Sequence, residues 1–473
     1  MFFTEYNNKT NTMKKLSNLS RITLLGSLGY LLLVLLPFAT QAQSTATNHS
    51  FSLEEAIRYG IRHNPTLEGA RVDERIVQSQ IKEVRGGALP QVNLSGQFSD
   101  SYLLPQQLLP GELFGGEPGT IRPVTFGVRY GLTGTAEVSQ TLFNQQLFTA
   151  IKSTSALKDL YQLNTLKTTQ DLVENIAKLY LQVQVSTVQR GLSQGNYDRI
   201  EQLVTIAQLQ YEDGLIKRTD VTQLEVNRAN LQTQLEDADF AIQQQANQLK
   251  SLLNLPVDHT LVLSENLVES SSYPMQDSLT MRANIQYRQL QQQQNLKTLE
   301  RKAAQAEYFP TLNAFFNYGY QGQTNELQFS GPGYNDFRTG TWGLAVNIPI
   351  FDGLQRHHRI QQRRLEGEQL RLQQTQLTNN IRVDYQNARN QLTLSQRQVD
   401  NQKQNTRLAE QLYEATSLSY KEGVAPLTEL LDAENSLQQA QSNYLSALLQ
   451  LKVSELDLLK NSGQLATILE TEL

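Results

Sequence analysis

The sequence predicts an α+β membrane protein whose chain repeats one plan twice, each time with a pair of strands and a pair of long antiparallel helices. Three observations lead to this prediction. A Tyr-x-x-Gly motif recurs at an offset of 209 residues. Two stretches alternate apolar and polar residues for long distances. Residues 144–211 and 354–420 show helical spacing and contain no Pro.

The repeat is clearest around the Tyr-x-x-Gly motif and is sought first because it sets the architecture. The pairs at the offset of 209 are Tyr211 and Tyr420, Gly214 and Gly423, Thr219 and Thr428, and Glu225 and Glu434. We therefore expect a first repeat at 43–255 with a strand pair at 89–142. A connection at 256–285 leads to a second repeat at 286–473 with a strand pair at 309–351.

The N-terminus has the parts of a secretory signal peptide, which we assign to residues 1–42. Basic residues precede the apolar run Ile22–Ala39, and small residues follow it. Met13 begins this pattern better than Met1 does, so either is a candidate start. A membrane anchor is the alternative interpretation of the run. The chain has no Cys, which excludes a lipid anchor on an N-terminal Cys and any disulfide.

Composition excludes two classes of protein. The mean hydropathy of −0.44 and hydrophobic content of 39% exclude a polytopic helical membrane protein, which needs repeated apolar stretches. The net charge of −5 argues against nucleic-acid binding, which requires a basic surface. Neither number excludes a β-barrel, because the strands of a barrel are apolar on one face only.

The predicted strands alternate strongly. Even positions from Val124 to Leu142 are mostly apolar, and Trp342 to Ile350 repeat the pattern. Their partners begin at Val92 and Leu312, across Gly/Pro-rich loops at 103–123 and 322–338. Aromatic residues suit the outside of a barrel, namely Phe126, Tyr130, Phe316, Tyr318 and Trp342. A soluble β-sandwich is the alternative interpretation of these strands.

Four strands are too few to close a membrane barrel, and an open sheet edge in lipid leaves backbone groups unpaired. If the strands lie in a membrane, several chains must therefore contribute them. Three chains would give about 12 strands, an even number within the range of bacterial barrels.

The long helices are expected at 144–211 and 354–420, where apolar residues of the second fall at steps of 7 and 4 in a coiled-coil rhythm. Shorter helices are expected at 52–87, 215–255, 281–308 and 427–460. Two short helices stacked end to end would match one long helix. The remaining positions are rich in Gln and Asn, which suits a wet lumen that does not bind its cargo.

Together these features resemble the TolC family of outer-membrane channels. The resemblance rests on Ser52–Ala56, His63–Pro65, Ile348–Gly353 and the two Tyr-x-x-Gly turns, and it covers nearly the whole mature chain. It implies a homotrimer with a 12-stranded barrel in outer-membrane lipid, four strands per chain. A long α-helical coiled-coil barrel crosses the periplasm, with residues 256–285 in a mixed equatorial zone. A periplasmic adaptor (membrane fusion) protein and an inner-membrane pump or ABC transporter are the implied partners.

Acidic residues near the second turn are the best candidates for a gate. Glu429 and Asp432 lie three apart, so they share a helix face, and three chains would stack them as two rings. Rings of carboxylates select cations. The resemblance implies constricting roles for both acids and places the gate-linking residues Thr219, Asp220 and Tyr420 beside them. Alternatively, Asp220 and Glu429 stabilise their helix N-termini through the helix dipole.

The turns themselves are candidate docking sites for the adaptor. The residues concerned are Gly214, Leu215, Ile216, Gly423, Val424 and Ala425. The chain has Ala425 where family members carry a basic gate residue. Lys217 and Arg218 of the first turn are candidates to replace it.

No catalytic constellation, cofactor motif or metal site is expected. Five His residues are scattered, and the adjacent pair His357 and His358 points in different directions on a helix. The predicted function is a passive exit duct of a tripartite efflux pump or type I secretion system, in the outer membrane of a diderm bacterium and extending into the periplasm. The alternative is a periplasmic coiled-coil adaptor or scaffold protein, which would not need lipid-facing strands.

Overall fold

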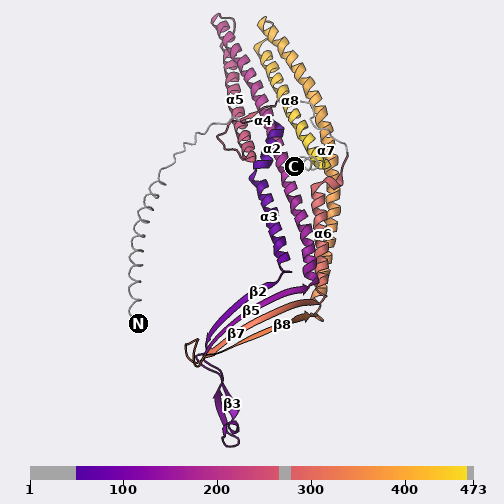
Figure 1. Ribbon diagram of the computed structural model, residues 1–473. Coiled ribbons are helices and arrows are strands. Elements are labelled where there is room, and N and C mark those ends of the chain that lie inside the picture. Colours follow the sequence, from indigo (N-terminus) through magenta and orange to yellow (C-terminus); the bar gives the residue numbers. More distant parts are fainter. Residues whose placement is uncertain (1–48, 266–277, 466–473) are drawn as a thin grey trace, which may run out of the picture. The chain divides into compact units, whose positions relative to one another are not determined.

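The computed structural model describes residues 49–265 and 278–465 (Figure 1), nearly all of which belong to one compact unit. The expected signal peptide at 1–42 and part of the connection at 256–285 lie outside the described residues.

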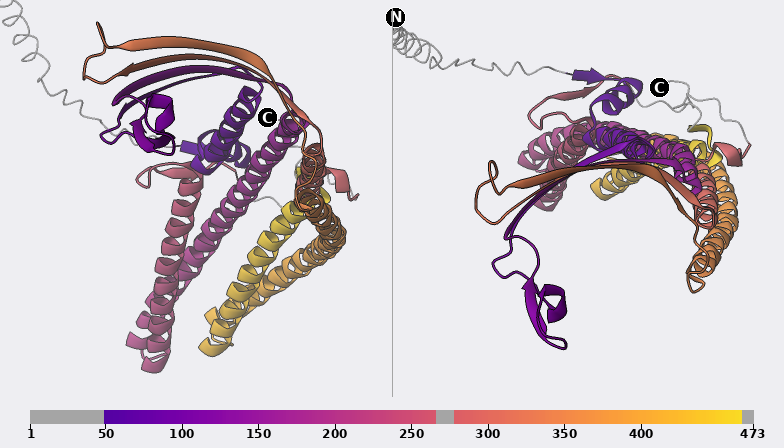
Figure 2. Two further views of the ribbon diagram at one scale, coloured as in Figure 1. Left: turned by 90° about the horizontal axis from the view of Figure 1, so that it is seen from below. Right: turned by 60° about the horizontal axis from the view of Figure 1, so that its bottom comes forward.

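One four-stranded antiparallel sheet contains the predicted strand pairs. It runs in the order β2 (Gln91–Asp100), β5 (Tyr130–Phe143), β7 (Thr311–Thr324) and β8 (Asn335–Asn347), and it is curved (Figure 2). The central β5–β7 pairing joins the two halves of the chain. Each outer strand pairs on one side only within the described chain, so β2 and β8 leave two open edges.

The register gives the sheet one apolar and one polar face. One cross-strand row consists of Val92, Val138, Phe316 and Trp342. The row beside it begins with Asn93, Glu137 and Asn317 and points to the other face. Trp342 is 79% exposed, and its apolar neighbours Leu344 and Val346 are exposed as well. The apolar face is therefore not covered by the described part of the chain itself.

The single strand expected across 124–142 is wrong. The chain turns at Gly127, with a φ of 103°, so β4 (Ile121–Thr125) ends before β5 begins. β4 pairs with β3 (Gln106–Pro110) in a separate hairpin within the predicted loop. The alternation of apolar and polar residues continues across this break. Such alternation indicates which residues share a face of a sheet, but it does not indicate which strands pair.

Two of the aromatic residues assigned to the barrel exterior differ from this expectation, one by its position and one by its burial. Phe126 is exposed but falls between β4 and β5, outside the four-stranded sheet. Tyr130 is buried, with its ring 6.2 Å from the ring of Phe98 and the Arg129 guanidinium 4.9 Å above it. Phe316, Tyr318 and Trp342 are exposed on the apolar face.

Two helical hairpins extend from the sheet. In the first hairpin, a short turn joins α4 (Gln145–Glu212) to α5 (Arg218–Leu253). In the second, a short turn joins α7 (Gln355–Lys421) to α8 (Leu427–Ser462). α3 (Pro65–Gly86) and α6 (Ile285–Ala306) pack along the sheet-proximal parts of α4 and α7 (Figure 1). Each long helix is thus matched by two shorter ones. Among the described helices, none combines the length and apolar character needed to cross a membrane.

The helix expected at 52–87 is two helices, α2 (Leu53–His63) and α3. Asn64 between them is extended, and its side chain caps α3 by accepting from the backbone N–H groups of Thr66 and Leu67. Pro65 causes the break because it has no N–H to donate and disfavours helical backbone at the preceding residue. A short 3-10 turn, η2 (Met281–Ala283), similarly precedes α6.

A hydrophobic core lies where α2 packs against α4 and α5. Ile176, Tyr180, Leu249 and Leu253 are fully buried there, and the Tyr180 hydroxyl donates to the carbonyl of Phe51 at 2.9 Å. Phe51 ends β1 (His49–Phe51), which pairs with β6 (Leu261–Leu263). This small sheet fixes the start of the described chain beside the midpoint of α4.

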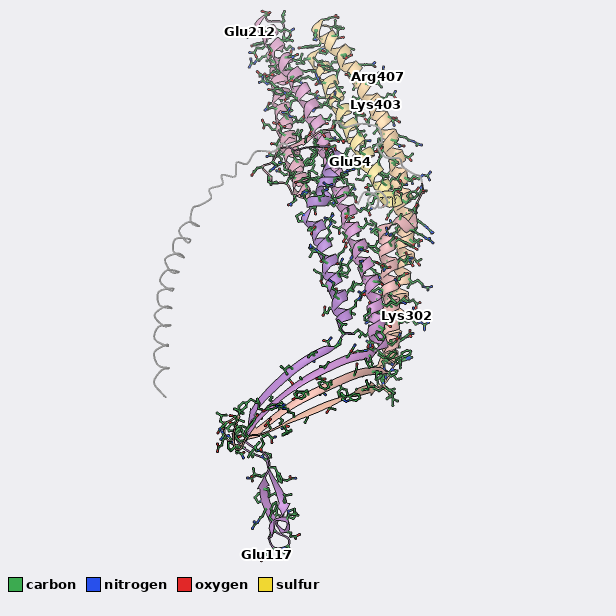
Figure 3. The ribbon with its side chains drawn as sticks, in the orientation of Figure 1. Glu54, Glu117, Glu212, Lys302, Lys403 and Arg407 are labelled. Carbon is green, nitrogen blue, oxygen red and sulfur yellow. The ribbon has the colours of Figure 1, made fainter. Side chains whose placement is uncertain are left out.

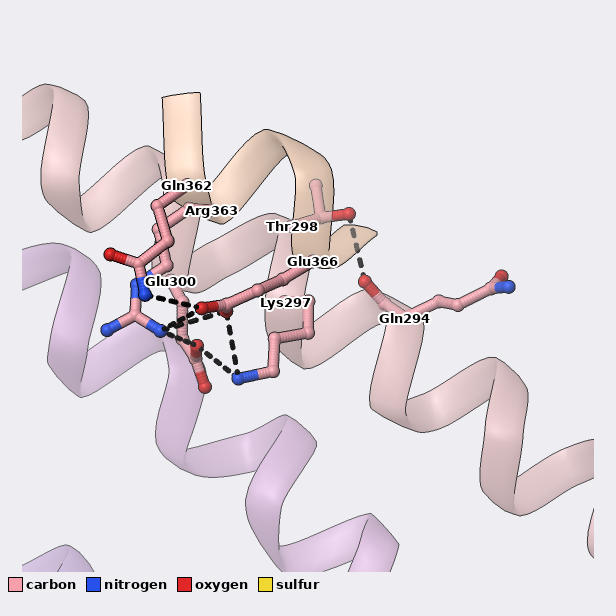
Figure 4. A network of polar contacts seen from close by, with 7 residues as sticks. All are labelled: Gln294, Lys297, Thr298, Glu300, Gln362, Arg363 and Glu366. Carbon is pink, nitrogen blue, oxygen red and sulfur yellow. Dashed lines mark hydrogen bonds and ion pairs between the residues drawn. The ribbon is translucent and has the colours of Figure 1, made fainter. Parts of the chain in front are cut away.

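Ion-pair networks tie the helices together away from the core. Figure 4 shows one between α6 and α7, in which Lys297 and Arg363 share the carboxylates of Glu300 and Glu366. A second joins α4 to α8. There Glu174 accepts from Lys178 at 2.7 Å and from Lys460 at 2.5 Å.

The half-buried Glu174 should make stability depend on pH. Burial acts to raise the pKa of its carboxyl, but the hydrogen bonds from Lys178 and Lys460 outweigh this and leave the pKa lowered from 4.5. A carboxylate with a lowered folded-state pKa stabilises the fold above its unfolded-state pKa, and this contribution is lost as pH falls through the folded-state pKa. Glu174→Gln should therefore lower the free energy of unfolding at pH 7 by about 2 kcal/mol.

The measurement is urea denaturation in detergent, followed by circular dichroism at several pH values. The difference between Glu174→Gln and wild type should shrink as pH falls below 4.5. Glu414→Gln, at an exposed position of α7, is the matched control and should unfold like wild type. A pH-independent difference would contradict the assigned role of the charge.

Candidate functional site

The two helical tips, defined here as residues 213–217 and 422–426, have the same backbone structure. Gly214 and Gly423 have φ values of 76° and 73°, which residues with a Cβ adopt only at a cost. The N–H of Leu215 donates to the carbonyl of Gln210 at 2.8 Å, and that of Val424 to Ser419 at 2.9 Å. These bonds close each helix with the same motif, as the repeated sequence predicts.

The aliphatic residues of the tips are exposed unequally. Leu215 is 72% exposed and Val424 is 78% exposed, whereas Ile216 and Ala425 are half-buried. Ile216 packs against a cluster of buried residues from α4, α5 and α8. Of the residues expected to dock an adaptor, Leu215 and Val424 are therefore the ones that present apolar surface to a partner. Glu212, labelled in Figure 3, marks the end of α4 beside the first tip.

Three of the expected gate residues lie together. The Asp220 carboxylate accepts from the backbone N–H of Lys217 at 3.4 Å and from the Thr219 hydroxyl at 3.4 Å. Tyr420 is half-buried, and burial together with the negative charge of Asp220 raises the pKa of its hydroxyl. Asp220 thus belongs to the N-terminus of α5 and at the same time faces the hairpin of the second repeat.

The two acids expected to constrict the channel, Glu429 and Asp432, lie on the first turns of α8 and face away from the core. Leu427, Leu430 and Leu431 are buried in the cluster between the hairpins, whereas Glu429 and Asp432 are exposed. Their separation of three residues places both carboxylates on one helix face. Neither acid forms an ion pair within the described residues, so both are available to a neighbouring chain or to the solvent.

The proposed substitute for the basic gate residue lies at the first tip. Arg218 is exposed, with its guanidinium 5.7 Å from the centre of the Tyr211 ring. Lys217 is also exposed. Both cations are therefore positioned on the surface of the tip, within the same protomer as the acids.

Sequence reasoning missed a buried ion pair behind the tips. Glu434 of α8 is 2% exposed and accepts from two nitrogens of Arg199 on α4, at 2.9 and 3.4 Å. The guanidinium also bonds the side chain of Asn196 and lies 5.3 Å from the ring centre of Tyr413 on α7. This pair connects the first hairpin to the second.

The repeat offered a partial signal for this pair. Glu434 matches Glu225 at the offset of 209, but among the described residues Glu434 forms an ion pair with an Arg and Glu225 does not. Burial and the negative charge of Glu434 raise the pKa of the Tyr413 hydroxyl. A sequence repeat cannot distinguish which of two matched acids will be buried, because the two hairpins contact different neighbours.

No group of His, Asp or Glu side chains within the described chain is arranged to bind a metal ion. His357 and His358 are exposed, and their rings meet edge to face at 5.3 Å. One open surface hollow in the described part of the chain has a volume of about 410 Å³ and is lined by residues that include Lys178, Leu179 and Leu252.

A four-stranded sheet with one exposed apolar face, continued by two long helical hairpins, is the architecture expected of an outer-membrane channel. The model of the outer membrane efflux protein family matches residues 60–255 and 275–464, and the chain belongs to this family. The expected resemblance to TolC-type proteins is thereby confirmed. A search of curated proteins finds no relative that matches.

Solved structures share the fold. The outer-membrane channel CmeC of Campylobacter jejuni has a TM-score of 0.72 at 13% identity, with 89% of this chain and 88% of that chain covered. The open state of the MtrE channel of Neisseria gonorrhoeae has a TM-score of 0.69 at 18% identity, with 87% and 88% covered. VceC of Vibrio cholerae has a TM-score of 0.67 at 16% identity, with 87% and 96% covered.

Family membership assigns the chain to the outer membrane, with its helices extending into the periplasm, and gives it the role of an exit duct in efflux. The family consists of channels that conduct passively. The alternative of a periplasmic scaffold is set aside, because it does not account for the family match or for the four-stranded sheet.

The shared geometry of the tips predicts that their glycines are needed. Gly214→Ala and Gly423→Ala should each destabilise their turn by about 1 kcal/mol, because a Cβ is disfavoured at positive φ. Gly191→Ala is the control, since Gly191 lies within α4 with open space around it and Ala favours a helix. Hydrogen exchange of residues 210–220 and 419–429 is the measurement. Unchanged exchange in both tip variants would contradict the prediction.

The buried carboxylate of Glu434 predicts that substitutions at the matched positions of the two repeats lower the free energy of unfolding by different amounts. Glu434→Ala removes the buried carboxylate and leaves the guanidinium of Arg199, whose side chain is 33% exposed, without its ion-pair partner. It should cost about 1–3 kcal/mol of unfolding free energy. Glu225→Ala, at the matched position of the first repeat, should cost less than about 0.5 kcal/mol. Arg199→Met with Glu434→Leu should recover most of the loss, because apolar residues replace both charges. Equal effects of Glu434→Ala and Glu225→Ala in urea denaturation would disprove this role.

Proposed function

We propose that three copies of this chain form the exit duct of a tripartite efflux pump or type I secretion system. The single observation that supports the trimer best is the sheet with two open edges. Backbone groups in lipid must all be hydrogen-bonded, so the β2 edge of one copy requires the β8 edge of another. Three copies give a closed barrel of about 12 strands. The exposed apolar face with Trp342 then faces lipid.

The outer face of α7 supports the same assembly. Six aliphatic residues form one stripe along the helix, opposite the side that packs against α8, and all six are exposed. They are Leu365, Leu372, Val383, Leu394, Leu408 and Leu412. An apolar stripe on one side of a long helix is suited to packing against a second helix. In the proposed trimer, this second helix comes from the adjacent copy.

In this proposal the chain consists of two repeats, 43–255 and 286–473, joined by the connection at 256–285. The helical tips point into the periplasm. Leu215 and Val424 contact a periplasmic adaptor, and an inner-membrane pump or ABC transporter supplies the energy. The duct itself catalyses no reaction and needs no cofactor. Exposed Gln and Asn side chains along the helices give a hydrated wall that does not retain the cargo.

Glu429 and Asp432 form the gate in this proposal. Both are exposed and unpaired by other described residues, so three copies bring three carboxylates together at each level. Negative potential in a narrow pore favours cations. Thr219, Asp220 and Tyr420 hold the tips together beside these rings, and Arg199 and Glu434 fix the two hairpins of each copy to one another.

The test is single-channel recording in a planar bilayer under a salt gradient. The wild type should conduct weakly and prefer cations. Asp432→Ala should conduct more and shift the reversal potential toward zero, because one ring of carboxylates is lost. Asp400→Ala, at an exposed acid of α7 away from the tips, should behave like wild type.

Two outcomes would count against the proposal. Equal selectivity in wild type and Asp432→Ala would place the gate elsewhere while leaving the duct intact. A correctly folded, detergent-purified oligomer that never conducts would contradict the channel itself.

A further inference from the structure

The β3–β4 hairpin is an insertion between β2 and β5, at the end of the sheet opposite the helices (Figure 1). It consists of β3, the 3-10 turn η1 (Gly111–Phe114) and β4. Its strands pair with each other and not with the four-stranded sheet. It therefore adds nothing to the barrel wall, and its role needs a separate explanation.

The tip of this hairpin is held by its own hydrogen bonds. The N–H of Gly111 donates to the carbonyl of Thr120 at 2.7 Å, and the N–H of Gly119 donates to the Glu112 carboxylate at 3.0 Å. The N–H of Gly116 donates to Gly111 at 2.9 Å. Glu117 lies at the far end, as labelled in Figure 3. The hairpin is thus a structured arm.

One face of the arm is apolar and bare. Leu108, Pro110, Ile121 and Pro123 alternate along the two strands and therefore point to the same side. All four are exposed, and Leu108 and Ile121 are each 67% exposed. An isolated two-stranded hairpin is marginally stable in water, and an exposed apolar patch indicates a contact surface. This face requires a partner.

The two prolines define how a partner can bind. Pro110 and Pro123 have no N–H, so neither strand offers a complete edge for the addition of another strand. A partner must therefore pack its side chains onto the apolar face. The arm leaves the sheet from β2, the open edge that meets a second copy in the proposed trimer. The nearest surface for packing is then the same arm of another copy.

We propose that the arms of three copies pack their apolar faces together over the outer mouth of the channel. This inference rests on the proposed trimer, in which a threefold axis brings three identical faces to one point. A barrel of about 12 strands has a radius of about 12 Å, whereas a five-residue strand is about 17 Å long. Each arm is therefore long enough to reach the axis.

The arms form an outer constriction, separate from the acidic gate at the helical tips. Contact between side chains alone, without a backbone ladder, is weaker than strand pairing and allows the arms to part. Glu112 and Glu117 remain at the hydrated end of each arm.

The absence of Cys from the chain permits a direct test by site-specific cross-linking. Ile121→Cys and Leu108→Cys are made in the full chain and treated in outer-membrane vesicles with a short bismaleimide. Arg122→Cys is the control, since Arg122 is exposed on the other face of the same strand. Ile121→Cys and Leu108→Cys should cross-link at least about tenfold faster than Arg122→Cys, because packed arms have a high effective concentration.

Native mass spectrometry and bilayer conductance of the same samples separate the possible failures. If the protein is a conducting trimer but the three variants cross-link equally slowly, the arms do not pack together. That result contradicts this inference and leaves the proposed function intact. If a fluorophore attached to the thiol of Ile121→Cys is instead quenched by bilayer-embedded quenchers, the apolar face lies on lipid and the inference is wrong. A monomeric, non-conducting chain overturns both proposals.

Discussion

Unpaired backbone groups at the two edges of the sheet are the constraint on which the rest of the structure depends. β2 and β8 each lack a neighbour on one side, and lipid offers no hydrogen bonds to replace the missing strand. The apolar row through Val92 and Trp342 adds a second requirement, namely an apolar environment for this face of the sheet. The described part of a single chain leaves the face uncovered. Both demands are satisfied together when identical sheets join edge to edge. In the proposed trimer, each chain therefore completes a barrel that a single chain leaves open.

The helical region meets a different requirement, which is to keep two long hairpins aligned over the length of α4 and α7. The buried core around Tyr180 holds α4 against α5 near the middle of α4. Close to it, the ion pairs of Glu174 with Lys178 and Lys460 join α4 to α8. Closer to the tips, the buried pair of Arg199 and Glu434 connects the two repeats. These contacts lie within one protomer, whereas Glu429 and Asp432 remain exposed for contacts in the assembly. The buried ion pair thus lies behind the tips, whereas the two exposed acids lie on α8 close to the second tip.

The duplicated sequence produces matched turns with different surroundings. The backbone bonds of Leu215 and Val424 are equivalent, because local sequence determines how a helix ends. Side chains at matched positions then diverge, since Tyr211 is exposed whereas Tyr420 is half-buried against the cluster between the hairpins. The same turn thus occurs twice in the chain, and its surroundings differ between the two repeats. Asp220 near the first turn faces the second hairpin, whereas Glu429 and Asp432 near the second turn are exposed.

The sequence by itself determined the helices and strands that have strong periodicity, and also the positions of the two glycine turns. α4, α7 and the four strands followed from spacing, and Gly214 and Gly423 from the need for positive φ. The break at Pro65 also follows from local chemistry, although helical spacing of apolar residues continues across it. Only the tertiary structure decided which elements are neighbours. It separated β4 from β5, buried Tyr130, and paired Glu434 with Arg199 while leaving Glu225 without such a partner. Periodicity records the face of a residue, whereas burial and pairing depend on segments that are distant in the chain.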